Sequence, residues 1–265
     1  MVHTIRPEIA VIGGSGFYSF LDDPVQVAVE TPYGPPSADI AIGEVAGTPV
    51  AFLPRHGTDH EFAPHRINYR ANMWALRSVG VRRVLAPCAV GGLLPEVSPG
   101  DIVLPDQLVD RTAHRVATYV DSGAAHAPFA DPYCPTLTEA VAGVDDSIKA
   151  GATMVVVEGP RFSTRAESRS YAAQGWSLIN MTGHPEAVLA REMLMCYLPI
   201  ALVTDMDAGV EVGAGVDQVS VFAMFAENIE RLKVILAKAV ADLPPARDCD
   251  CAGWADDIDL PYDLP

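Results

Sequence analysis

The sequence predicts a single-domain α/β protein in which a central β-sheet is flanked by helices. Its length of 265 residues suits one large domain with a sizeable core. Short apolar segments alternate with segments of helical periodicity, and residues 198–204 form an almost uninterrupted apolar run, which is typical of a strand covered on both faces. We find no internal repeat. The domain is therefore expected to span residues 1–243, and the Pro- and Asp-rich stretch 244–265 to form an extended tail or an arm onto a neighbour.

Strands are predicted at residues 8–12, 39–44, 49–53, 82–86, 100–104, 153–157, 176–180 and 198–204. Residues 39–44 and 49–53 alternate or run apolar around Gly47, which indicates a hairpin. Residues 153–157 are rich in β-branched side chains, which are typical of a core strand.

Helices are predicted over residues 68–79, from Thr164, from about Thr182 to Leu194, and over 217–241. In the first, Ala71, Trp74, Ala75 and Leu76 are spaced to lie on one buried face. Thr164 and Glu167 have the spacing of a capping box, which marks a helix start. Residues 113–135 show no periodicity, and a loop of that length is expected to be a lid or a subunit contact.

Composition and charge narrow the class of partner. Apolar residues make up 49% of the chain and charged residues 20%, as expected for a globular protein. The net charge of −16 argues against nucleic acid and anionic membranes as partners, so any bound anion must be held by a local cluster of donors. No apolar run approaches the roughly 18 residues of a membrane span, and no basic-then-apolar leader begins the chain. We therefore expect a cytoplasmic protein.

The five cysteines are Cys88, Cys134, Cys196, Cys249 and Cys251. Their odd number and scattered spacing argue against a disulfide framework. Cys249 and Cys251 could bind a metal or respond to redox change, but no second Cys/His pair lies beside them in the sequence. We therefore expect two free thiols in the tail.

Two segments that follow predicted strands have the composition of anion sites. Residues 13–16 are glycine-rich, so their amides and Ser15 could face an anion, although a tight turn without a ligand is the alternative. In the segment 54–60, Arg55 offers a fork for phosphate oxygens, and His56 and His60 add donors. A zinc site at the two histidines and an ordinary surface loop remain open.

The apolar run 198–204 leads directly into two carboxylates, Asp205 and Asp207. On extended backbone, side chains at i and i+2 point the same way, so both could face one ligand. Two like charges so close should raise at least one pKa, which prepares one carboxyl to hold a proton near neutral pH. A solvated turn and a magnesium-binding pair are the alternatives.

The predicted strands are thus followed, in chain order, by segments that carry polar or glycine-rich groups. These are the Gly-Ser loop 13–16, Arg55-His56, the Cys/Gly loop 87–92, Phe162-Ser163, Met181-Thr182 and the pair Asp205 and Asp207. If these segments converge, one end of the site binds an oxyanion and the other binds a group with nitrogen donors. That combination suggests attack of phosphate on the anomeric carbon of a nucleoside. Phosphate is itself the nucleophile, so the protein has to align it and protonate the departing base.

Several stretches together resemble the trimeric purine nucleoside phosphorylase family, and within it the 5′-methylthioadenosine phosphorylases. The matching stretches are Ile12–Gly16, Arg55–His60, Asn68–Leu76, Gly100–Val103, Glu158–Ser163, Asn180–Thr182 and Thr204–Asp207. The resemblance covers residues 8 to about 240 and leaves the tail out. It implies the nucleoside phosphorylase fold, with a central mixed β-sheet, partly barrel-like, flanked by helices.

The resemblance also implies roles for individual residues. Phosphate would be held by Ser15, Arg55, His56, Thr182 and the amide of Ala89. The nucleoside would be bound by His60, His126, Phe162, Ser163, Met181, Val221 and Phe222. Of these, Met181 would pack under the ribose, and His126 would reach the site of a neighbouring subunit.

The aspartates would perform the catalytic step. Asp205 would protonate or hydrogen-bond N7 of the purine, and Asp207 would accept a hydrogen bond from the 6-amino group. The implied reaction is phosphorolysis of 5′-methylthioadenosine to adenine and 5-methylthioribose 1-phosphate, in methionine and purine salvage. Inorganic phosphate is the co-substrate, and no cofactor or metal is expected. A homotrimer is expected, possibly a dimer of trimers.

Two departures from the family pattern keep other substrates open. Cys88 stands where many members have Thr or Asn beside phosphate, and a thiol is a poor donor. In addition, Gly183 and His184 follow Met181-Thr182 at the positions where the best-known methylthioadenosine enzymes have Thr and Val. The alternatives are a methylthioinosine or 6-oxopurine nucleoside phosphorylase on the same fold, a hydrolase, and a non-catalytic nucleoside-binding protein.

Overall fold

The computed structural model describes residues 6–14, 17, 20–210 and 215–265. Within this part of the chain, eleven strands form one mixed sheet. The strands are β1 (Ile9–Gly13), β2 (Asp22–Val27), β3 (Ile40–Val45), β4 (Thr48–Pro54), β5 (Arg83–Gly92), β6 (Ile102–Leu104), β7 (Gln107–Arg111), β8 (Lys149–Ala150), β9 (Thr153–Val157), β10 (Leu178–Asn180) and β11 (Cys196–Met206). The mixed sheet expected from the sequence is confirmed.

The sheet is organised around the two longest strands, β5 and β11. They run parallel and pair along almost their whole length, from Cys196 opposite Arg83 to Met206 opposite Gly92. The main path runs β2-β3-β4-β1-β5-β10-β9-β7, and β11 branches from β5 to join β6 and β8. All residues from Cys196 to Thr204 are buried, which explains the uninterrupted apolar run.

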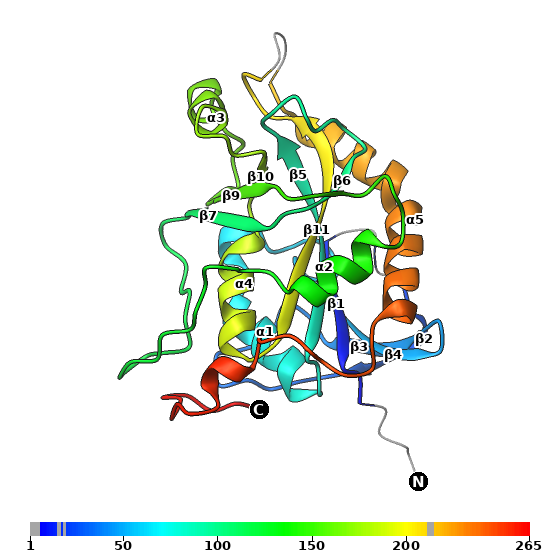
Figure 1. Cartoon of the computed structure of the whole chain (residues 1–265), viewed down its shortest axis with the longest axis vertical. Coiled ribbons are helices and arrows are strands. Elements are labelled where there is room, and N and C mark those ends of the chain that lie inside the picture. Colours follow the sequence, from blue (N-terminus) through cyan, green and yellow to red (C-terminus); the bar gives the residue numbers. More distant parts are fainter. Residues whose placement is uncertain (1–5, 15–16, 18–19, 211–214) are drawn as a thin grey trace.

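Helices cover both faces of this sheet (Figure 1). They are α1 (Tyr69–Ser78), α2 (Pro135–Ala142), α3 (Arg165–Ala172), α4 (Gly183–Glu192) and α5 (Gln218–Asp242), with short 3₁₀ turns at Pro64–Arg66 and Gly253–Ala255. In Figure 1, α1 and α4 lie on one side of the β5–β11 pair and α5 lies on the other. The predicted helices α1, α3, α4 and α5 are confirmed, including the capping box between Thr164 and Glu167. None of the helices in the described residues is long and apolar enough to cross a membrane.

The sequence prediction is wrong in several places, and strands β2 and β8 are among the elements that it missed. The glycine loop expected at residues 87–92 is the second half of β5, because β11 and β10 pair with it. A side chain at Gly91 would come within 2.9 Å of Ile179, so glycine there permits close packing. Strand β7 and helix α2 were also not predicted, because β7 is mostly polar and α2 is only eight residues long.

The stretch 244–265 packs against its own chain. Trp254 Nε1 donates to the carbonyl of Arg191 at 3.2 Å, and the Tyr262 hydroxyl donates to the carbonyl of Glu192 at 2.8 Å. Both acceptors lie in the last turn of α4, beside which the red C-terminal segment runs in Figure 1. Cys249 and Cys251 are free thiols, as expected, and the fold brings the distant Cys134 and Cys196 close to them.

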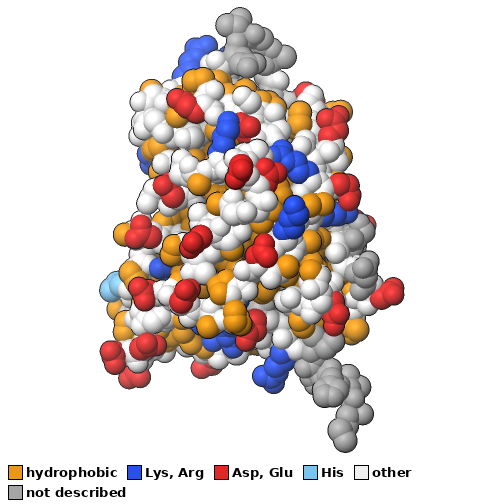
Figure 2. Space-filling view, turned by 45° about the vertical axis from the view of Figure 1, so that its right-hand side comes forward, with side chains coloured by type: hydrophobic (Ala, Val, Ile, Leu, Met, Phe, Trp, Pro, Cys, Tyr) orange, Lys and Arg blue, Asp and Glu red, His pale blue; other side chains and the backbone are white. Residues whose placement is uncertain are grey.

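The surface agrees with the acidic composition. Figure 2 shows Asp and Glu side chains spread over the face in view, between apolar patches. Because the charge is distributed and negative, the selection of an anionic ligand depends on the local structure of its site.

Candidate active site

One cavity of about 430 Å³ opens beside the carboxyl ends of β5 and β11. Its walls include twelve of the residues predicted from the sequence: Arg55, His56, His60, Ala89, Phe162, Ser163, Met181, Thr182, Asp205, Asp207, Val221 and Phe222. The cavity is large enough for a nucleoside-sized ligand. Ser15 lies outside the described residues, although its neighbour Gly14 lines the cavity. His126 is exposed and does not line it.

Strand β11 carries the two aspartates into the cavity. The register with β5 shifts between Val203 and Asp205, so a bulge lies just before the first carboxylate. Bulges commonly redirect side chains next to functional sites. Both Asp205 and Asp207 line the same cavity, as the i, i+2 spacing predicted.

Asp205 is the carboxyl prepared to hold a proton. Burial raises its pKa to about 6, the hydroxyl of Thr204 at 2.8 Å opposes this shift, and the charge of Asp207 adds to it. The predicted rise in pKa thus has burial as its main cause, and the neighbouring carboxylate contributes less. Near neutral pH, a fraction of Asp205 keeps its proton, as a general acid requires.

Asp207 is held by a residue that the sequence analysis missed. Its Oδ2 accepts a hydrogen bond of 2.5 Å from Ser168 Oγ in α3, and both residues are buried. This contact fixes one carboxylate oxygen, so the other is left to face the cavity. No local sequence signal marks Ser168, because the contact joins two elements 39 residues apart.

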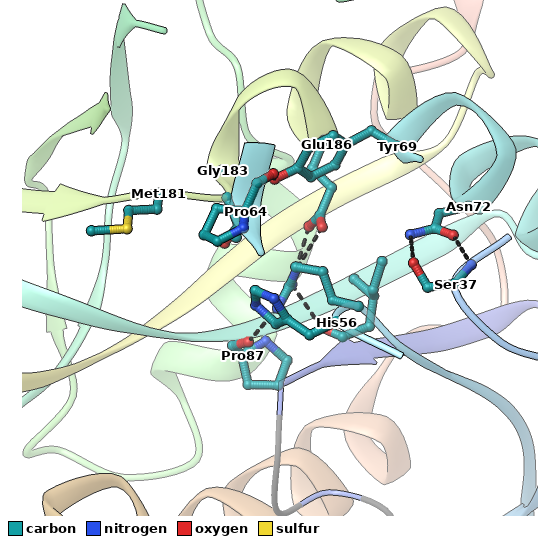
Figure 3. Close-up of polar contacts among 12 residues, drawn as sticks. Ser37, His56, Pro64, Tyr69, Asn72, Pro87, Met181, Gly183 and Glu186 are labelled. Atoms are coloured by element: carbon teal, nitrogen blue, oxygen red, sulfur yellow. Dashed lines mark hydrogen bonds and ion pairs between the residues drawn. The ribbon is translucent and has the colours of Figure 1, made fainter. Parts of the chain in front are cut away.

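Arg55 lies in the cavity wall, but its fork is already bound. Nε and Nη2 both donate to the carboxylate of Glu186 in α4, while Nη2 also donates to Ile12 O and Nη1 to Pro87 O. Figure 3 shows Glu186 pointing from its helix toward the strands. The fork predicted to grip phosphate thus grips Glu186, and one Nη1 proton remains for a ligand.

The Arg55–Glu186 pair is fully enclosed. Arg55 is 2% exposed and Glu186 is 0% exposed, and the hydroxyl of Tyr197 donates a further hydrogen bond of 2.8 Å to the carboxylate. Burial alone would lower the pKa of Arg55, but Glu186 reverses this effect and keeps the pKa above its usual range. A buried Glu in the helix that follows Met-Thr is the signal that could have identified this partner, because buried carboxylates are almost always paired.

His56 is neutral and has a defined hydrogen-bond partner. Burial and the charge of Arg55 lower its pKa to about 4, although the Phe62 carbonyl opposes this shift. Its Nδ1 lies 2.8 Å from Phe62 O, so in the neutral ring Nδ1 carries the proton and Nε2 is an acceptor. His56 was predicted to donate to an anion. In this state its Nε2 would instead accept a hydrogen bond from a phosphate hydroxyl.

Asn180 organises the start of α4 beside the cavity. Its Oδ1 accepts from the backbone N–H groups of Thr182 and Gly183 at 2.7 and 2.6 Å, and its Nδ2 donates to Ala89 O at 3.1 Å. The two amides at the helix start are therefore bound within the protein. The hydroxyl of Thr182 also donates to Asn180 Oδ1, over a long 3.4 Å, so it would have to turn away from this contact to donate to an anion.

Apolar and aromatic side chains form much of the rest of the walls, with the polar residues Glu61 and Gln218 among them. The ring of His60 stacks on His56 at 4.4 Å and meets Phe222 edge-on at 5.6 Å. Burial lowers the pKa of His60. Phe222 is 45% exposed, so it stands at the open side of the cavity. In the view of Figure 3, Gly183 lies between Met181 and Glu186.

Arg115 is a further residue that the sequence analysis missed. It lies in the segment without helix or strand that was expected to be a lid or a subunit contact. Its guanidinium donates to the carbonyls of Met181, His184 and Glu158 at 2.6–2.8 Å. Arg115 therefore fixes the backbone on which Met181 lies. Its position in a polar loop gave no signal of this role.

The zinc and magnesium sites considered from the sequence gain no third protein ligand among the described residues. Among the described residues, the one group of three or more His, Cys, Asp or Glu side chains with metal-like spacing is formed by cysteines. It includes neither the histidines His56 and His60 nor the aspartates Asp205 and Asp207.

Comparison with known proteins identifies the family. A model of the phosphorylase superfamily matches residues 8–241, and the chain belongs to that superfamily. The S-methyl-5′-thioadenosine phosphorylase of Mycolicibacterium smegmatis is 58% identical over 97% of this chain and 99% of its own length. The purine nucleoside phosphorylase of Streptomyces coelicolor is 55% identical over the whole of both chains. The resemblance seen in the sequence is thus confirmed.

Two solved structures support the same fold and family. A methylthioadenosine phosphorylase from an Antarctic soil metagenomic library superimposes with a TM-score of 0.84 at 41% identity, covering 89% of this chain and 86% of that chain. The methylthioadenosine phosphorylase of Schistosoma mansoni in complex with adenine gives a TM-score of 0.84 at 33% identity, covering 89% and 91%.

Proposed function

We propose that this protein catalyses the phosphorolysis of 5′-methylthioadenosine, giving adenine and 5-methylthioribose 1-phosphate. The observation that carries the proposal is one cavity lined by Arg55, His56 and Thr182 together with Asp205 and Asp207. Relatives at 58% and 46% identity bear the name S-methyl-5′-thioadenosine phosphorylase. The reaction places the enzyme in methionine and purine salvage.

In the proposed reaction, a phosphate oxygen forms a bond to C1′ of the ribose while the C1′–N9 bond breaks. The electron pair of that bond moves into the purine, and Asp205 donates its proton to N7 or shares it in a hydrogen bond. The pKa of about 6 at Asp205 suits this transfer near neutral pH. Phosphate supplies the nucleophile, so no covalent intermediate with the protein is needed.

At the phosphate end, the hydroxyl of Thr182 and the remaining N–H of Arg55 are the proposed donors, with the amide of Ala89 and Ser15 contributing. His56 Nε2 accepts the hydrogen of a monoprotonated phosphate. Burial raises the pKa of Cys88 to about 12, so this wall residue is a neutral thiol that adds no negative charge near the anion.

At the nucleoside end, Asp207 accepts from the 6-amino group with its oxygen that does not face Ser168. A 6-oxopurine would place its carbonyl against this acceptor and lose the hydrogen bond, so we expect a preference of at least roughly tenfold for 6-aminopurines. The proposed positions for the remaining groups are the purine between Phe162 and Ser163, and the methylthio group against Val221 and Phe222.

A homotrimer, possibly paired into a dimer of trimers, is the proposed assembly, and the cytoplasm the proposed location. The exposed position of His126, away from the cavity of its own chain, supports a role for this residue at a partner's site. Analytical ultracentrifugation tests the assembly, and a fully active monomer would contradict the role of His126.

One assay separates the candidate functions. The protein is incubated with 5′-methylthioadenosine, methylthioinosine or inosine, with and without phosphate, and the free base is followed. We expect phosphate-dependent release of adenine, at least about ten times faster than release of hypoxanthine. Faster release from methylthioinosine or inosine would favour a 6-oxopurine enzyme. Release without phosphate would indicate a hydrolase, and no release from any substrate a binding protein.

A further inference from the structure

Four of the five cysteines form one cluster far from the cavity. The sulfur atoms of Cys134, Cys196, Cys249 and Cys251 all lie within 4.8 Å of one another. Three of these residues are buried and Cys249 is partly buried. Cys88, the fifth, lines the cavity instead.

The cluster joins three separate parts of the fold. Cys134 is the N-cap residue of α2, Cys196 is the first residue of β11, and Cys249 and Cys251 lie in the C-terminal stretch. The backbone N–H of Cys134 donates to Tyr197 O at 3.0 Å, and that of Cys196 donates to Arg82 O at 2.9 Å. These two ligand positions are therefore fixed by the fold itself.

The C-terminal stretch is fixed on both sides of its two cysteines. Before them, Arg247 Nη1 donates to Leu194 O at 2.9 Å, and Thr136 donates to Asp248 at 3.0 Å. After them, Trp254 donates to the carbonyl of Arg191. The two sulfur atoms are thus presented to the other pair on an ordered backbone.

We propose that this cluster is a structural zinc site with four cysteine ligands. Tetrahedral zinc with Zn–S bonds of about 2.3 Å separates its sulfur ligands by about 3.8 Å, which fits a set of atoms confined within 4.8 Å. Each sulfur has the other three as neighbours, as around a single ion. Four thiolates without a water position are the ligand set of structural zinc sites.

The alternative for such a cluster is one or two disulfides. A disulfide requires two sulfur atoms about 2.05 Å apart. All four cysteines are free, and Cys196 Sγ lies 3.3 Å from Cys249 Sγ, within reach of a shared ion rather than at bonding distance.

The zinc would fasten the C-terminal stretch to the base of β11. That strand carries Asp205 near its other end, and the stretch also contacts the last turn of α4, whose N-cap residue Thr182 lines the cavity. The site stabilises the fold without touching substrate. Its loss should lower the melting temperature, because the free energy of metal binding adds to that of folding.

The test is metal content, which does not depend on the proposed reaction. The full chain is purified under reducing conditions, equilibrated with zinc ions and freed of excess, and zinc is measured by mass spectrometry. We expect about one zinc per chain. Cys249→Ser and Cys251→Ser should each lose it, whereas Cys88→Ser, the matched control outside the cluster, should retain it.

A second measurement on the unchanged protein keeps the proposal testable if those variants do not fold. Replacing zinc with cobalt should give the sulfur-to-metal charge-transfer absorption of a tetrahedral thiolate site. Absence of metal in the reduced, zinc-treated chain would overturn the proposal. So would a mass deficit of two or four hydrogens from disulfides, or zinc that persists in both tail variants.

Discussion

The two ends of the cavity differ in the partners of their ionisable side chains. At the proposed phosphate end, the cation Arg55 is paired with the anion Glu186, and neither is more than 2% exposed. At the purine end, Asp205 and Asp207 line the same wall with hydroxyl partners, Thr204 and Ser168, rather than cations. The charge at the first end is therefore paired within the protein before any ligand arrives, whereas the carboxylates at the second end have hydroxyl partners.

This difference indicates separate tasks for the two ends. A pair that is complete within the protein holds β4 and α4 in place and gives the anion a preformed wall. A carboxyl whose pKa is raised by burial carries an electrostatic cost that a nitrogen-bearing ligand can relieve, which is typical of catalytic groups. Substitutions at the first end should therefore reduce stability, and substitutions at the second should mainly reduce turnover.

The largest expected effect is on the stability of the phosphate end. Glu186→Ala leaves the buried guanidinium of Arg55 without its partner and should lower the free energy of unfolding by about 3–5 kcal/mol. Urea denaturation measures this loss. The double variant Arg55→Met with Glu186→Leu should recover most of the stability without recovering phosphate binding. A loss under about 1 kcal/mol in Glu186→Ala, as at a surface pair, would contradict the comparison.

The next effect is on turnover at the purine end. Asp205→Asn removes the proton donor and should reduce turnover of 5′-methylthioadenosine by about 10²-fold or more. Adenine release in saturating phosphate measures it. Asp146→Asn, which removes the same charge from an exposed site, is the control and should leave turnover unchanged. If Asp205→Asn were fully active, the proton would have to come from another group.

A smaller effect is expected where Ser168 supports Asp207. Ser168→Ala leaves one oxygen of a buried carboxylate without its donor, at a cost of about 1–3 kcal/mol. We expect kcat/KM for 5′-methylthioadenosine to fall by roughly tenfold, and the preference for adenine over hypoxanthine to narrow. Ser168→Thr keeps the hydroxyl and should restore both values. If Ser168→Ala and the unchanged protein had the same preference for adenine over hypoxanthine, Asp207 would not be the residue that recognises the 6-amino group.

The smallest expected effect is the dependence of stability on pH. Below about pH 4, Asp205 is protonated in both the folded and the unfolded chain. Between that pH and about 6, the unfolded chain loses this proton while the folded chain keeps it, so folding loses stability as the pH rises. Asp205→Asn lacks this loss, so its stability relative to the unchanged protein should increase by at most about 1.4 kcal/mol per pH unit in this window. Denaturation at several pH values measures the difference, and a constant difference would mean that the pKa is not raised.

Much of the fold was predictable because its signals are local. The pattern of β11, the hairpin of β3 and β4, and the capping box of α3 each depend on neighbouring residues, and each was identified correctly. The second half of β5 was not identified, because a strand containing Pro87, Gly91 and Gly92 forms only when other strands pair with it. Twelve of the predicted site residues line one cavity, most of them because strand ends deliver them to the same edge of the sheet, whereas Val221 and Phe222 reach it from α5.

The sequence by itself determined which chemical groups reach the site and in what order, because residue type and strand periodicity are properties of short segments. Only the tertiary structure decided how those groups are used. Arg55 is bound by a glutamate 131 residues away, and four cysteines from three distant segments meet in one cluster. Such pairings depend on how elements pack, and burial then fixes which donors and protons remain for a ligand.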